Sequence, residues 1–88
     1  MTTKAPSAVE SASPDTLESI AYASVAGITT VEPNDRQRLG YHIWRWLSSR
    51  EGTLEGAIGE SAARLTMPSA TAASQILAVL KEKGVTLP

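Results

Sequence analysis

Apolar residues recur at intervals of three and four positions along most of the chain, which is the spacing of helices that bury one face. Four stretches follow this pattern, and they cover residues 14–27, 34–52, 53–66 and 68–84. The sequence therefore predicts an all-α fold, a small three- to four-helix bundle. A chain of 88 residues leaves no room for a second core.

Residue types that favour helix ends stand at the borders of these stretches. Pro68 disfavours the helical conformation of the residue before it, so we expect a hinge at Met67–Pro68 between the last two helices. The other predicted caps and stops are Ser13 and Gly27 for the first helix, Asn34 or Asp35 and Gly52 for the second, Thr53 and about Thr66 for the third, and Gly84 for the fourth.

The first stretch of the chain differs in composition from the rest. Residues 1–14 are rich in Ser, Thr, Ala and Pro and carry few large apolar side chains. Such a segment does not bury enough apolar surface to offset the entropy lost on ordering. We expect residues 1–14 to be a disordered tail and residues 15–88 to form a single helical domain.

Composition excludes several classes of protein. Eight Lys and Arg stand against nine Asp and Glu, so the chain is neither strongly basic nor strongly acidic. Without Cys and with His42 as the only histidine, the sequence predicts no metal site and no cofactor. The serines lie in no nucleophile motif, so we expect no enzyme activity. No apolar run approaches the roughly 20 residues of a membrane span, and we expect a cytoplasmic protein.

The second predicted helix carries the most varied chemistry. Its apolar stripe, which includes Trp46, is expected to face the core. Tyr41, Arg38 and Arg45 lie on the opposite side, and Trp44 lies at the margin of the core stripe. The outer side chains could form an ordinary solvated face, or they could anchor a phosphate or an acidic partner helix. Trp44 could be a boundary residue or part of a contact surface, because Trp is enriched in interfaces.

The segment "GTLEGAIGESAARLTMPSATAASQILAVLKEKGV" resembles the helix-turn-helix core of winged-helix transcription regulators, and with the preceding helix the resemblance covers about residues 35–85. In that family a Thr-Leu opens a helix of small residues, and a Leu-x-Met-Pro turn leads to the next helix. A β-hairpin wing follows the closing Gly-Val in the family and is missing here. The matching positions are Thr53, Leu54, Ala62, Leu65, Met67, Pro68, Thr71, Ala72, Leu77, Leu80, Gly84 and Val85.

The resemblance implies that the last helix projects into the major groove of DNA. The side chains expected to contact bases lie near its start, at Ser69, Thr71, Ala72, Ser74 and Gln75. This helix has no Arg or Lys before Lys81, so phosphate contacts would have to come from Arg36, Arg38, Arg45, Arg50 and Arg64.

Two functions of different classes follow from the sequence. The first is a small helix-turn-helix-type DNA-binding protein that regulates transcription, as a monomer or as a homodimer formed through the first helix or Trp44. The second is a non-enzymatic protein-interaction module, such as an adaptor, an inhibitor or a subunit of a larger assembly, with Tyr41 and Trp44 at the interface. A continuous basic face that joins the last helix to the arginines of the second would favour DNA.

Overall fold

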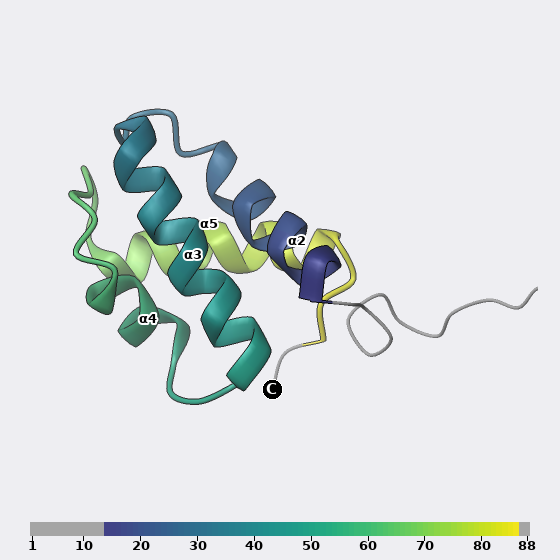
Figure 1. The fold of residues 1–88 in the computed structure, drawn as a ribbon. Coiled ribbons are helices and arrows are strands. Elements are labelled where there is room, and N and C mark those ends of the chain that lie inside the picture. The colour runs from purple at the N-terminus through teal and green to yellow at the C-terminus, as the bar shows by residue number, and fades with distance from the viewer. Residues whose placement is uncertain (1–13, 87–88) are drawn as a thin grey trace, which may run out of the picture.

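The structure, a computed structural model, describes residues 14–86, and within this range the chain is all-helical with no strand. The helices are α2 (Pro14–Ala26), α3 (Pro33–Ser49), α4 (Leu54–Glu60) and α5 (Ser69–Glu82). Helices α2 and α3 run in opposite directions side by side, α4 packs beside α3, and α5 crosses behind α2 and α3 (Figure 1). The predicted small helical bundle is confirmed. The expected tail lies outside the described residues, except that Pro14 begins α2.

One continuous core joins all four helices. Helix α3 contributes its predicted stripe, including Trp46, and α5 contributes a stripe that faces it across the core. Because the side chains are mainly aliphatic, the helices pack closely, and Leu39, Ile43, Ile76 and Leu80 have no exposed surface. The buried apolar residues are Ile20, Ala21, Val25, Ile28, Val31, Leu39, Ile43, Trp46, Leu47, Leu54, Ile58, Ala72, Ala73, Ile76, Leu80 and Val85.

Helix α3 begins and ends earlier than the sequence indicates. Its N-cap is Glu32, with Pro33 at the first position, so the predicted cap at Asn34 or Asp35 is wrong. Its C-cap is Arg50, which adopts the left-handed conformation at φ 58°. The C-cap therefore lies two residues before Gly52, the predicted stop. The side chain of Arg50 donates from Nε to the carbonyl of Leu47 at 3.1 Å and from a terminal nitrogen to the carbonyl of Thr86 at 2.9 Å. These bonds offset the strain of a left-handed non-glycine residue.

Helix α4 is shorter than predicted, because it ends at Glu60 and not near Thr66. The hydroxyl of Ser61 donates to the carbonyl of Ile58 at 2.6 Å, and Ala62 takes the left-handed conformation at φ 57°. Local side-chain bonds of this kind compete with the helical pattern. Ala62 is therefore exposed. The N-cap at Thr53 is confirmed, since its Oγ1 accepts a bond from the Gly56 N–H at 3.0 Å.

The connection between α4 and α5 spans residues 61–68 and is longer than the three or four residues of a tight helix-turn-helix turn. Leu65 and Met67 pack partly against the core, and the Thr66 hydroxyl shares a 2.8 Å hydrogen bond with that of Thr30. The connection therefore lies against the loop before α3. Helix α5 then starts after Pro68, as the sequence indicates.

The end of α5 follows the sequence expectation. Gly84 adopts φ 86°, and the N–H of Val85 donates to the carbonyl of Leu80 at 3.0 Å. This is the pattern of a glycine-terminated helix in which the residue after the glycine packs back on the core. Val85 is correspondingly buried.

Candidate functional site

The outer face of α5 is polar near its start. Thr71, Ser74 and Gln75 are exposed, and Ser69 is half-buried. Pro68 provides no side-chain bond to the N-terminal N–H groups of the helix. The sequence has no Asp or Glu between Glu60 and Glu82, so nothing on the first turns of α5 repels an anion.

The prediction that Ala72 contacts bases is wrong. Its side chain has no exposed surface and belongs to the core, together with Ala73 and Ile76. The buried residues of α5 are Ala72, Ala73, Ile76 and Leu80, and Leu77 is only half-buried. A residue covered in this way cannot contact DNA without unfolding of the helix.

The five predicted phosphate-binding arginines do not come together. Arg64 is exposed in the connection just before α5. Arg36 is half-buried in a depression between α2 and α3 that Tyr22 also lines. Arg38 donates to Asp35 at 3.4 Å, and the guanidinium of Arg50 is bonded to backbone carbonyls.

The outer face of α3 points away from α5. The buried side chains of both helices meet in one core, so their exposed faces are directed to opposite sides of the domain (Figure 1). Arg38 and Arg45 are exposed on the α3 side. A rigid duplex docked on α5 would therefore reach neither of these arginines. Among residues 14–86, the continuous basic face expected of a strong DNA-binding protein is not formed.

Tyr41 is the centre of an aromatic cluster on the outer face of α3. With 43% of its surface exposed, it is the one exposed large hydrophobic residue in the described range. Its ring makes edge contacts with His42 at 5.5 Å and Trp44 at 5.9 Å between centroids, and the Arg45 guanidinium lies 5.8 Å from the Tyr41 centroid. Contacts on three sides hold the Tyr41 ring in place while one side stays open.

Trp44 lies at the margin between this cluster and the core, as its position on the helix predicts. It is half-buried and packs against the core residues. Its Nε1 is buried and finds no hydrogen-bond partner in residues 14–86. Trp46, by contrast, is buried and donates from Nε1 to the carbonyl of Gly52 at 3.1 Å.

Tyr22 of α2 covers α3 next to the cluster. Its ring lies over Gly40 so closely that a Cβ at that position would come within 2.5 Å of a ring carbon. Burial raises the pKa of the Tyr22 phenol above its usual value, and the charges of Glu18 and Tyr41 act in the same direction. The phenol therefore stays neutral, and a hydrogen-bond donor, throughout the physiological pH range.

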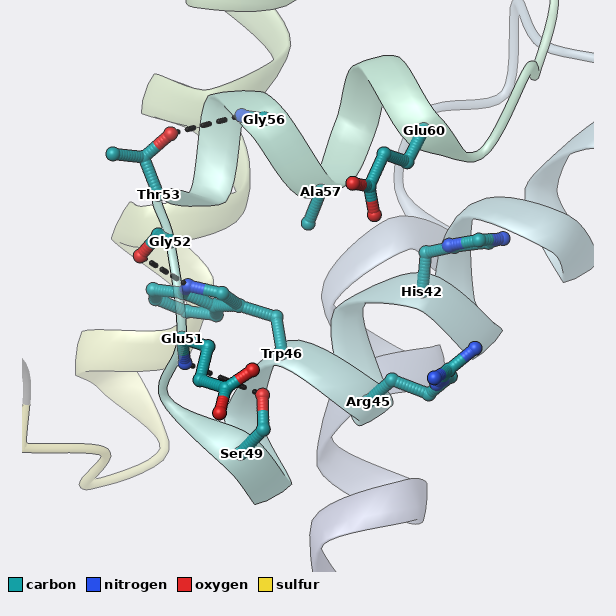
Figure 2. A pocket seen from close by; sticks show the side chains of 10 residues that line it. All are labelled: His42, Arg45, Trp46, Ser49, Glu51, Gly52, Thr53, Gly56, Ala57 and Glu60. Carbon is teal, nitrogen blue, oxygen red and sulfur yellow. Dashed lines mark hydrogen bonds between the residues drawn. The ribbon is translucent and has the colours of Figure 1, made fainter.

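A groove of 370 Å³ lies between α3 and α4, and the sequence did not predict it (Figure 2). Small residues at Gly52, Gly56 and Ala57 leave space beside the Trp46 indole. In the sequence, only these small residues, which follow the segment with Tyr41, Trp44 and Trp46, could have indicated the groove. The lining residues are His42, Arg45, Trp46, Ser49, Glu51, Gly52, Thr53, Gly56, Ala57 and Glu60.

The chemistry of the groove is mixed. His42 and Arg45 extend from α3, while Glu60 extends from α4 on the other side (Figure 2). The hydroxyl of Ser49 accepts a bond from the N–H of Glu51 at 3.3 Å. Across residues 14–86 no group of three or more His, Asp or Glu side chains is placed to hold a metal ion. The groove thus presents charged side chains of both signs.

No protein-family model, curated protein or solved structure matches the chain. No helix among the described residues is long and apolar enough to cross a membrane.

Proposed function

We propose that the chain is a small helix-turn-helix-type DNA-binding protein that regulates transcription, with α5 as its recognition helix. The observation that carries the proposal is the exposed, polar and carboxylate-free outer face at the start of α5. A cytoplasmic location belongs to the same proposal.

The contacts follow from the chemistry of the exposed side chains. The Gln75 amide has the donor and acceptor needed to pair with adenine, and the hydroxyls of Ser69, Thr71 and Ser74 can bond to bases or phosphates. The free N–H groups of the first turn favour an anion, since they lie at the positive end of the helix dipole. Arg64, exposed in the connection before α5, is the arginine that we expect to contact a phosphate beside this turn.

The affinity of one such module is expected to be low, because few cations lie on the α5 side. Lys81 adds one positive charge farther along the helix. A homodimer would raise the affinity by binding two half-sites. A dimer formed through Trp44 would hold the two α5 helices on opposite sides of the pair, where they could not face one duplex together. We therefore expect a dimer that binds DNA to form through α2.

Binding to DNA is expected to depend on salt with a small slope. The affinity can be measured by fluorescence anisotropy of a labelled random-sequence duplex, and it should decrease as the salt concentration rises from about 50 to about 200 mM. A plot of log K against log salt concentration should have a slope of roughly −1 to −2, as expected for one or two phosphate contacts. Arg64→Ala should reduce the slope by about 1. The matched control is Arg45→Ala, which removes an arginine from the outer face of α3. This substitution should leave the slope unchanged.

Three outcomes would contradict the proposal: binding that ignores salt, an equal loss in Arg45→Ala, or no binding at low salt. The last outcome would favour the alternative function, a non-enzymatic protein-interaction module such as an adaptor, an inhibitor or a subunit. The specific observation for that alternative is the exposed Tyr41 cluster with Trp44 at its margin.

A further inference from the structure

The outer face of α3 is a second surface that the α5 proposal does not use. Its outward positions are exposed along the whole helix, and Tyr41 lies at their centre. The exposed residues are Asn34, Gln37, Arg38, Tyr41, Arg45 and Ser48. Contacts with His42, Trp44 and Arg45 already restrict the Tyr41 ring. Little conformational entropy would therefore be lost if a partner packed on it.

The outward positions of α3 carry charge of one sign, while Glu60 of α4 lies across the neighbouring groove from His42 and Arg45 (Figure 2). Arg38 and Arg45 are exposed, and none of the outward positions carries a carboxylate. The only acidic residue within α3 is Asp35, which is buried and paired with Arg38 at 3.4 Å. The Arg38 side chain remains 61% exposed in spite of that pair. The face is therefore complementary to a negatively charged surface.

A shallow hollow of 470 Å³ lies beside Tyr41. Tyr22, Tyr41 and Arg38 are among the residues that line it. The hollow also extends to Asn34, Gln37, His42 and Ser61. A lining that includes aromatic residues and an arginine suits an apolar side chain that has a carboxylate nearby on the same ligand.

We propose that the outer face of α3 binds an acidic amphipathic helix of a partner protein. An apolar side chain of the partner packs against Tyr41 in the hollow, and its carboxylates pair with Arg38 and Arg45. A DNA duplex fits this face less well. A duplex would use the two guanidiniums but would leave the exposed Tyr41 ring without a partner. Because α5 lies on the other side of the core, the two surfaces bind independently.

The test is a titration of the full-length, ¹⁵N-labelled protein with a synthetic helical peptide that carries leucines on one face and glutamates on its flanks. The amides of Tyr41 and Arg45 and the Trp44 indole N–H should shift, while α5 should not. Tyr41→Ala should weaken binding by roughly 10-fold or more, as for an interface anchor. Gln75→Ala, on α5, is the matched control and should bind the peptide as the unchanged protein does.

A second peptide, with lysine in place of each glutamate, tests the charge complementarity. It should bind at least about 10-fold more weakly, because it places like charges against the arginines. Equal binding of both peptides would overturn the inference, as would shifts confined to α5 or no shifts at millimolar peptide. Shifts of Tyr41 and Arg45 on addition of duplex DNA instead of peptide would make this face a nucleic-acid surface and would also overturn it.

Discussion

Ala72→Asp is expected to remove most of the stability of the domain. Ala72 has no exposed surface and lies among the apolar core residues of α5. A carboxylate placed there without a partner costs at least about 3 kcal/mol. A domain of this size has a free energy of unfolding on the order of 5 kcal/mol. Urea denaturation followed by the helical circular dichroism signal measures the loss.

Ala78→Asp is the matched control for this prediction. Ala78 lies on the exposed face of the same helix, so the same change there should cost less than about 1 kcal/mol. If both variants were equally stable, Ala72 would be an accessible position and could return to the set of base contacts. The comparison therefore decides whether the recognition face of α5 includes Ala72.

Gly40→Ala should destabilise the contact between α2 and α3 by about 1–3 kcal/mol, the usual cost of overpacking. The added Cβ would lie 2.5 Å and 2.7 Å from two ring carbons of Tyr22. The Tyr22 ring must shift to make room, and the shift disturbs its packing against α3. The thermal unfolding midpoint should fall accordingly.

Gly59→Ala makes the same chemical change where there is space. A Cβ at Gly59 meets nothing within 4 Å, and the residue lies inside α4. The variant should gain up to about 1 kcal/mol, because alanine favours the helix over glycine. A fall in stability at Gly59, or none at Gly40, would show that the packing of α2, α3 and α4 differs from the structure.

The helices themselves were predictable, because each buries one face and the apolar period of each is local. The errors lie at helix ends that depend on distant residues or on a single side chain. Arg50 ends α3 with a bond to Thr86, and no local pattern reveals that contact. Ser61 ends α4 through its own hydroxyl, which a stripe of apolar positions does not indicate.

The sequence predicted which side chains are exposed on each single helix of the candidate site, but not how the helices lie relative to one another. The exposure of Thr71, Ser74 and Gln75 agrees with the helical period. Whether Arg38 and Arg45 join them depends on how α3 and α5 pack around the core, and periodicity within one helix carries no information about that packing. The arrangement separates one predicted site into two surfaces on opposite faces.

The most direct test of this separation is an amide chemical-shift map of the ¹⁵N-labelled protein with a random-sequence DNA duplex at low salt. We predict shifts at Arg64, Thr71, Ser74 and Gln75, and none at Tyr41 or Arg45. Shifts on the α3 face, or none at all, would contradict the assignment of α5 as the DNA-binding helix.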